Sequence, residues 1–266
     1  MEKKLKIVAL TLLLTVMAIP TLAQDDSSGH LPDYNNETFH FGFLLGFNEM
    51  TYALNTVKDY QNIAQPADSW PSGPYSPMHT QCLYVQNIEP MLAPGLTLGL
   101  TCNLRLSNHL DLRFIPSMSF GERHMQYNIG VQDVDGSITT NSFTKKIYTT
   151  FIEFPFNLKY RILRYNNAGP YLIGGINPRI DLASQKAAKE QDFYGNIYIN
   201  NFVTKRFDCA AEFGVGLDLY TKWIKLGIEV KMSEGLMDIV KAPALIYTAP
   251  INKLRNRTFY VSLLFE

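Results

Sequence analysis

The sequence predicts an all-β protein, an antiparallel up-and-down transmembrane β-barrel of eight strands with long external loops and short periplasmic turns. Three observations lead to this fold class. Apolar and polar residues alternate with period two in eight segments. Most of these segments have about 9–13 residues, and a tilted strand crosses a bilayer in about 9–11 residues. The connections between the segments alternate between short and long, which is typical of outer-membrane barrels.

The first residues of the chain resemble a targeting segment. Lys3, Lys4 and Lys6 precede an apolar run over 7–19, and the small residue Ala23 follows shortly after. A basic start, an apolar run and a small-residue site predict a secretory signal peptide over 1–23, cleaved after Ala23. The run is shorter than the ~20 residues of a spanning helix, which argues against an anchor. A polar periplasmic leader (24–37) and the barrel domain (38–266) follow.

The eight alternating segments each carry one apolar row. They are 39–47, 95–106, 110–121, 148–160, 171–182, 207–219, 224–232 and 259–265. None of the eight apolar rows contains Asp, Glu, Lys or Arg. We therefore expect these rows to face lipid. The residues that represent them are Phe39, Phe41, Phe43, Leu98, Leu112, Phe114, Phe154, Phe156, Phe213, Val215, Ile228, Phe259 and Phe265.

The opposite rows carry charges of both signs in nearly equal numbers. These residues are Arg105, Asp111, Arg113, Glu153, Lys159, Arg179, Asp181, Asp208, Glu212, Asp218, Lys225, Glu229 and Lys231. The alternative is a soluble sandwich whose charges face water. Glycines such as Gly42, Gly99 and Gly214 share the charged face, and small residues suit the narrow lumen of an eight-stranded barrel. Balanced charges also suit pairing in a confined interior. The sequence thus predicts a charge network inside the lumen.

The connections support the same orientation of the strands. Short ones are expected near 107–109, 164–169 and 221–222, and long ones over 48–93, 122–146, 183–205 and 234–256. An even number of strands places both termini in the periplasm. Pro116, Pro155 and Pro178 lie inside predicted strands, where a residue without an N–H group favours a bulge or a frayed rim.

Composition excludes several classes of function. The 24 basic and 24 acidic residues give a formal net charge of zero, so no basic footprint for nucleic acid exists. Three cysteines without metal-ligand spacing predict no metal and no other cofactor. His40 is the only His within the eight predicted strand segments and has no Ser two positions away, which disfavours a membrane-embedded esterase. Asp133-Val134-Asp135 is followed by Gly136 and predicts a turn. The chain is therefore predicted to have no catalytic residues.

Several blocks of the sequence resemble one family of barrels. The blocks are FHFGFLLGFN (39–48), PGLTLGLTCNLRLSNHLDLRFIPSMSFGER (94–123), IEFPFNLKYR (152–161), NNAGPYLIGGINPRIDL (166–182) and FGVGLDLY (213–220). Together they resemble the PorT family of outer-membrane barrels from Bacteroidetes. The resemblance extends over most of the chain after the signal peptide, and the most specific block is NLRLSNHLDLRFIP…FGER.

The resemblance implies a non-enzymatic component of type IX secretion, which exports proteins with C-terminal sorting domains and in some relatives is linked to gliding motility. The implied partners are outer-membrane lipid and other secretion-machinery proteins or cargo, with the barrel itself a monomer. Two alternatives stay open. One is a structural or adhesin-like surface barrel without a secretion role, and the other is a membrane-embedded hydrolase.

Overall fold

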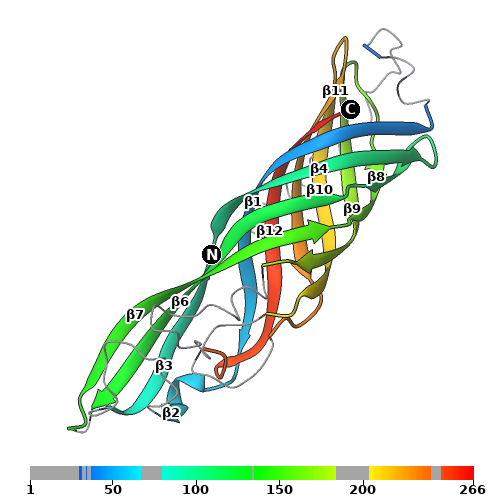
Figure 1. The fold of residues 1–266 in the computed structure, drawn as a ribbon. Helices are drawn as coiled ribbons and strands as arrows, with labels where there is room; N and C mark the ends of the chain where they lie inside the picture. The colour runs from blue at the N-terminus through cyan, green and yellow to red at the C-terminus, as the bar shows by residue number, and fades with distance from the viewer. Residues whose placement is uncertain are drawn as a thin grey trace.

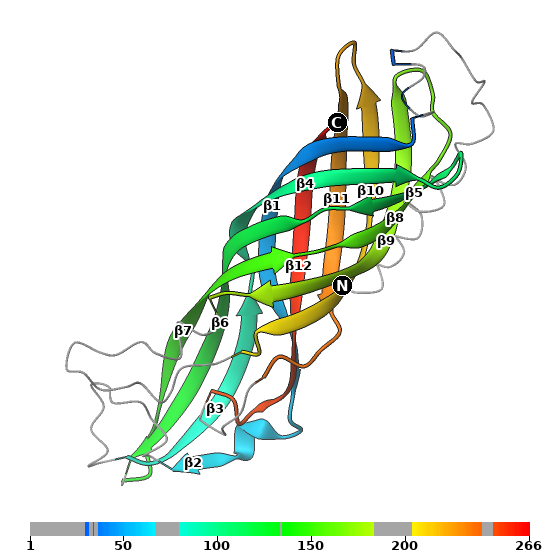
Figure 2. The same ribbon diagram turned by 45° about the vertical axis from the view of Figure 1, so that its right-hand side comes forward.

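The computed structural model describes residues 30–31, 34, 37–66, 80–133, 135–183, 204–240 and 247–266. The predicted signal peptide (1–23) and most of the predicted leader (24–37) lie outside these residues. The described strands form a tilted barrel from which three strands continue as a long extension (Figures 1 and 2). Among the described residues, no helix is long and apolar enough to cross a membrane.

Twelve strands and one short 3-10 helix make up the described part of the chain. They are β1 (Phe39–Thr56), η3 (Tyr60–Asn62), β2 (Ala64–Pro66), β3 (Thr80–Met91), β4 (Ala93–Arg105), β5 (Leu110–Phe114), β6 (Ser117–Asp133), β7 (Ile138–Glu153), β8 (Phe156–Arg161), β9 (Ala168–Asp181), β10 (Phe207–Tyr220), β11 (Lys225–Gly235) and β12 (Ile251–Phe265).

The strands close into a ring of eight, as the sequence predicts. The order is β10-β11-β12-β1-β4-β5-β8-β9, and β9 pairs with β10 to complete it. The first and last strands of the ring, β1 and β12, are antiparallel neighbours, with Phe43 opposite Phe265. Further along the axis, β6 and β7 take the places of β5 and β8 between β4 and β9. Closure leaves no open sheet edge inside the ring, which a membrane requires.

Two of the three prolines interrupt their strands. Pro116 separates β5 from β6, and Pro155 separates β7 from β8, because proline has no N–H group to donate to the ladder. The neighbouring carbonyls are still used: the Leu100 amide donates to Pro116, and the Ile115 amide donates to Pro155. Pro178, by contrast, lies within an unbroken β9, opposite Cys209. Each interrupted pair therefore counts as one barrel strand.

The three short connections lie together at one end of the barrel, which we call the turn end. They join β4 to β5, β8 to β9 and β10 to β11. The last residue of the chain lies at the same end, where the Lys225 amide donates to the Glu266 carbonyl. The predicted positions of the short turns therefore agree with the structure.

The predicted long loops over 48–93 and 122–146 are wrong in large part, because both regions contain strands. β1 continues to Thr56, β3 occupies Thr80–Met91, and β6 and β7 form a continuous hairpin across the second region. The strands β3, β6 and β7, with the short β2, form an extension that projects beyond the barrel opposite the turn end (Figure 2). Over 183–205 the structure describes only residues 183, 204 and 205. The predicted loop over 234–256 is shorter than expected, because β11 ends at Gly235 and β12 already begins at Ile251.

A reversal of side-chain polarity within β6 explains the error. Inside the barrel, its inward residues are polar and its outward residues are apolar, ending at Phe120. From Glu122 onward the outward residues are polar, whereas Met125, Tyr127 and Ile129 are buried on the inward side. The strand continues while its apolar row changes sides. A search for one uninterrupted apolar row therefore ends the strand too early.

The outer wall of the barrel carries the predicted lipid-facing residues. Most are exposed large hydrophobic side chains: Phe39, Phe41, Phe43, Leu98, Phe154, Phe156, Phe213, Val215, Ile228 and Phe259. Leu112, Phe114 and Phe265 are half-buried on the same wall. Phe114 stacks on Phe156 and Phe265 stacks on Phe43, with ring centroids 4.7 and 4.8 Å apart. We call this surface the apolar belt.

We expect Val215→Arg to prevent stable insertion into lipid. Val215 is 51% exposed in the middle of β10, and an arginine facing lipid at mid-depth costs about 2–4 kcal/mol. Heat-modifiable migration after folding into vesicles measures the inserted fraction. The matched control is Thr144→Arg, at an exposed position of the extension, which should insert like the wild type. Equal insertion of both variants would contradict the orientation of the wall.

Candidate functional site: the charged interior of the barrel

The predicted lumen charges gather in the interior of the ring. Asp111, Arg113, Glu153, Lys159, Arg179, Asp181, Asp208, Glu212, Asp218, Lys225, Glu229 and Lys231 are all buried. Arg105 is different, because it is half-buried at the turn end and donates to Asn108 at 2.7 Å. Charged groups in such an interior need counter-charges or hydrogen bonds, since burying an unpaired charge costs several kcal/mol. Their partners define the geometry of the interior.

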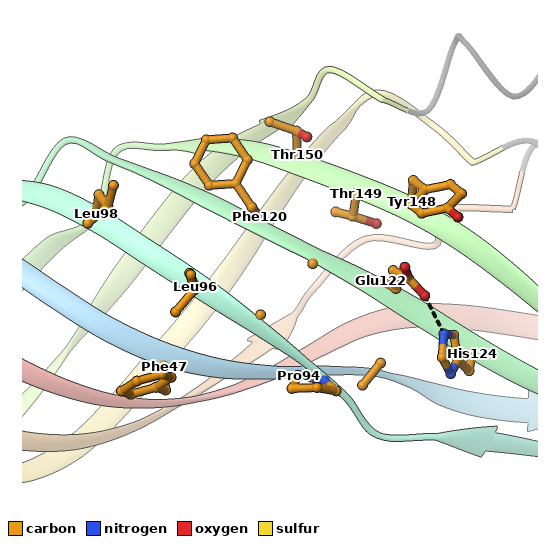
Figure 3. Close-up of a pocket in the computed structure, with 13 residues that line it drawn as sticks. Phe47, Pro94, Leu96, Leu98, Phe120, Glu122, His124, Tyr148, Thr149 and Thr150 are labelled. Atoms are coloured by element: carbon orange, nitrogen blue, oxygen red, sulfur yellow. Dashed lines mark hydrogen bonds and ion pairs between the residues drawn. The ribbon is translucent and has the colours of Figure 1, made fainter.

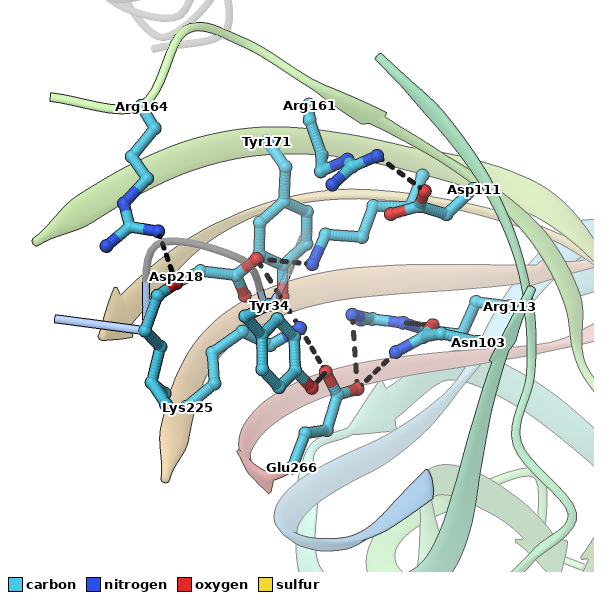
Figure 4. A network of polar contacts seen from close by, with 12 residues as sticks. Tyr34, Asn103, Asp111, Arg113, Arg161, Arg164, Tyr171, Asp218, Lys225 and Glu266 are labelled. Carbon is cyan, nitrogen blue, oxygen red and sulfur yellow. Dashed lines mark hydrogen bonds and ion pairs between the residues drawn. The ribbon is translucent and has the colours of Figure 1, made fainter. Parts of the chain in front are cut away.

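The carboxylate of Glu266 is the centre of the network at the turn end (Figure 4). It contacts the Lys225 ammonium, lies 3.6 Å from Nη2 of Arg113 and accepts a hydrogen bond from Asn103. Its side chain is fully buried. These partners come from β11, β5 and β4, so the C-terminal residue connects distant strands across the lumen.

A second carboxylate, Glu229, shares Arg113 with Glu266. Nη1 of Arg113 donates to Glu229 at 2.9 Å, and the hydroxyl of Tyr171 donates to the same carboxylate at 3.0 Å. The Tyr171 ring receives the Lys159 ammonium at 4.0 Å from its centroid. Gly216 provides the space for this ring, since a Cβ at that position would overlap it.

The ion pairs closest to the turns complete this end. Nζ of Lys159 is 2.5 Å from Asp218, and Nη2 of Arg161 is 3.0 Å from Asp111. Tyr34, a described residue of the predicted leader, lies over the same group. Its hydroxyl donates to Glu266 at 3.4 Å and its ring stacks on His40 at 4.0 Å. The leader therefore contributes a side chain to the network that the strands form.

The middle of the interior is organised around two glutamates. Glu212 pairs with Nζ of Lys231 at 2.8 Å and accepts amide hydrogen bonds from Asn157 and Asn177 at 2.9 and 2.8 Å. Glu153 accepts from the hydroxyls of Ser119 and Tyr260, both at 2.7 Å. Each carboxylate thus has several donors from different strands, which favours one fixed arrangement.

Two arginines form the last charged layer before the extension. Arg179 pairs with Asp208 through Nη2 at 2.7 Å and Nε at 3.0 Å. Arg123 pairs with Asp181 at 2.7 Å and donates through Nε to Thr149 at 2.6 Å. Asn256 connects the two pairs, because it accepts from Arg123 and donates to Asp208 at 2.8 Å.

Beyond this layer the interior becomes apolar. Tyr52, Met125, Tyr127, Ile129 and Leu254 belong to a buried cluster that also includes Leu83, Val85, Ile88, Val131, Ile147, Ile239, Tyr247 and Ile251. The guanidinium carbon of Arg123 lies 5.0 Å from the centroid of the Tyr52 ring, at the boundary between the charged interior and the apolar cluster. Burial raises the pKa of Tyr52 to about 12, so its hydroxyl stays neutral at physiological pH. A hydrophobic core therefore follows the charged interior along one axis.

Sequence reasoning missed Arg123, Arg161 and Glu266, which are charged members of the network. Arg123 fell in a region that was expected to be a loop, although it continues the inward row of Ser117, Ser119 and Gly121. Glu266 follows the last aromatic of β12, and its parity alone would have placed it on the same face as Leu264. The period-two count, extended by one or two residues beyond the end of each predicted segment, was the available signal.

Asp135 and Gly136, at the end of the Asp-x-Asp sequence, lie in a turn as predicted, and Val134 lies outside the described residues. Gly136 has a φ of +85°, which glycine adopts without strain, and the Ser137 amide donates to Asp135 at 2.9 Å. The hydrogen bonds from Ser137 hold the pKa of the Asp135 carboxyl below its ordinary value. No group of three or more metal-ligating side chains occurs among the described residues.

A closed ring with an apolar outer belt and a charged interior agrees with a family match. The family model described as an outer membrane protein beta-barrel domain matches residues 22–241, which is most of the chain. The chain belongs to this family of outer-membrane β-barrels. Its location is accordingly the outer membrane. A comparison with curated proteins found no match.

Solved barrels show similarity at low identity. The outer membrane protein OprG from Pseudomonas aeruginosa is 12% identical with a TM-score of 0.39, covering 90% of this chain and 97% of that one. The N-terminal β-barrel domain of OprF from the same organism is 10% identical with a TM-score of 0.26, covering 83% and 96%. The outer membrane protease OmpT from Escherichia coli is 9% identical with a TM-score of 0.31, covering 91% and 99%.

We expect Glu266→Gln to destabilise the folded barrel. The amide keeps the shape but removes the counter-charge of Lys225 and Arg113, and breaking a buried ion pair costs about 3–5 kcal/mol. Urea unfolding in detergent, followed by heat-modifiable migration, measures the loss. Glu49→Gln is the matched control, because Glu49 is exposed on the outer wall and its removal should be nearly neutral. Equal stability of the two variants would contradict the central place of Glu266.

Proposed function

We propose that the protein is a non-enzymatic barrel that serves as a component of the type IX secretion machinery, needed for export of proteins with C-terminal sorting domains. In this proposal the turn end faces the periplasm, and the extension of β2, β3, β6 and β7 lies outside the cell. Short periplasmic turns and longer external parts are the usual arrangement of outer-membrane barrels.

The filled interior is the observation that carries the proposal. The lumen of an eight-stranded barrel is only just wide enough for side chains. Here, large side chains such as Arg113, Arg179, Lys159 and Tyr171 are buried inside it and are held by partners on other strands. Such a barrel has no room for a cargo protein or a broad pore. Its contribution to export is therefore an accessory one, made by surfaces at its two ends.

The extension supplies an ordered surface for such contacts. Its inward side is held by the apolar cluster around Tyr127, and its outward side presents polar residues such as Gln126, Asn128 and Thr144. The side chain of Ser142 donates across the hairpin to Asn128 at 2.7 Å. A packed sheet keeps its shape when a partner binds, and so avoids the entropy cost of ordering a loop. Support for secretion as the process comes from the sequence blocks that resemble PorT proteins.

Deletion of the gene is expected to stop export of cargo with sorting domains. The wild-type gene should restore export. A variant in which a tight turn replaces residues 127–143 should reach the membrane yet restore less export, because the outer part of the hairpin is missing. Secretion is measured by cargo in the medium, and insertion by heat-modifiable migration. Normal export from the deletion strain would reject the secretion role and favour a structural or adhesin-like barrel.

The purified protein should not conduct ions in a planar bilayer. The interlocked charged side chains fill the cross-section at several levels, so no continuous water path of ionic width is expected. Single-channel recording over a range of voltages tests this, with a conducting porin added under the same conditions as the control. Stable, stepwise conductance from this protein would show an open lumen and would contradict an accessory role that depends on a filled one.

A further inference from the structure

A groove lies on the outer wall where the barrel continues into the extension. It has a volume of about 870 Å³ and is lined by residues of β1, β4, β6 and β7. The lining residues are Phe47, Ala93, Pro94, Gly95, Leu96, Leu98, Phe120, Gly121, Glu122, His124, Tyr148, Thr149 and Thr150. Figure 3 shows Leu96, Phe120 and Tyr148 on neighbouring strands around it. Neither the charged interior nor the proposed secretion role uses this surface.

An interrupted ladder in the wall produces the hollow. β3 pairs with β6 up to Met91 opposite His124, and β4 resumes with β6 at Gly95 opposite Gly121. Three residues between these pairs on one strand therefore face two on the other. Pro94 lies within this gap and has no amide hydrogen to donate. Such an irregularity bends a strand and changes the surface locally.

The groove has an apolar floor and an ionisable rim. Phe47, Leu96 and Phe120 are large hydrophobic side chains of the belt, with 67%, 49% and 42% of their surface exposed. On the adjoining outward row, the Glu122 carboxylate lies 2.7 Å from Nε2 of His124 (Figure 3). The floor thus lies at the depth of lipid chains and the rim at the depth of headgroups.

The rim also carries a cation next to His124. Lys146 is the cross-strand neighbour of His124 on β7 and is exposed. Within the described part of the chain, Lys146 makes no ion pair, whereas Glu122 is occupied by His124. The contact between Glu122 and His124 leaves the Lys146 ammonium available to a ligand. A phosphate would supply the opposite charge.

We propose that this groove binds one phosphate-bearing membrane lipid. An acyl chain lies along Phe47, Leu96 and Phe120, and the phosphate is held by Lys146 and by Nδ1 of His124, whose ring Glu122 orients. The change from apolar to ionisable side chains at Glu122 favours an amphiphilic ligand. A soluble anion would bury no apolar surface on the floor of the groove. An uncharged lipid would leave Lys146 without an ion-pair partner.

Native mass spectrometry of the purified barrel tests the proposal with three probes. Dimyristoyl phosphatidylglycerol has both chain and phosphate, dimyristoyl glycerol has only the chains, and glycerol 3-phosphate has only the phosphate. We expect one phosphatidylglycerol per barrel and at least about threefold weaker retention of either partial probe, as expected for loss of an exposed charge contact or of the apolar contact.

Two variants locate the site. Leu96→Trp should fill the groove and reduce retention of phosphatidylglycerol at least about tenfold, since it removes the contact along the chain. Lys146→Glu should reduce it at least about threefold without weakening dimyristoyl glycerol. The control is Val230→Trp, at an exposed position of the belt on β11, which should retain the lipid.

Equal loss in Leu96→Trp and Val230→Trp, or no loss in either, would overturn the site. Retention of dimyristoyl glycerol equal to that of phosphatidylglycerol would overturn the role of the phosphate. Retention of glycerol 3-phosphate equal to that of the lipid would overturn the role of the floor. Folding of every variant is verified by heat-modifiable migration before the measurement.

Discussion

Alternate side chains of each strand face two different media, and the identity of those media changes along the molecule. In the barrel, lipid is outside and a crowded polar interior is inside, so the outward row is apolar and the inward row is charged. In the extension, water is outside and the strands pack on each other, so the rows exchange character. On β6 the exchange takes place between Phe120 and Met125. The same strand continues through both environments without a break in its hydrogen bonding to β7.

This reversal sets the limit of what the sequence could predict. The ring of eight, its antiparallel order and the short turns could be predicted because eight uncharged period-two rows are joined by alternating short and long connections, as in outer-membrane barrels. Residues such as Lys159 and Asp218 could be assigned to the interior by their parity together with the glycines and balanced charges of their face. The pairing between them could not, since parity gives the side of the sheet but neither the strand tilt nor the partner across the lumen. The extension was missed because the rule for membrane strands does not apply outside the membrane.

The ion pairs of the interior explain why the barrel adopts a single register. A one-residue slip of any strand would place its charges in lipid and its phenylalanines in the lumen. Glu266 adds a constraint at the last residue, because its partners Lys225, Arg113 and Asn103 lie on three different strands. A register error between β12 and β1 would remove the shared counter-charge of two cations. The Glu266 carboxylate therefore favours the correct pairing of β12 with β1, which closes the barrel, and does not only stabilise its own surroundings.

The junction between barrel and extension has to satisfy both polarity patterns within a few residues. Arg123 does so on the inside: its guanidinium pairs with Asp181 on the charged side and lies against the Tyr52 ring on the apolar side. On the outside, the interrupted ladder around Pro94 allows β3 and β4 to change direction while both stay paired with β6. The bend then leaves apolar side chains exposed on the barrel side of Glu122 and ionisable side chains exposed on the side of the extension. An amphiphilic groove at this level is therefore a direct consequence of joining a membrane barrel to a water-exposed sheet through continuous strands.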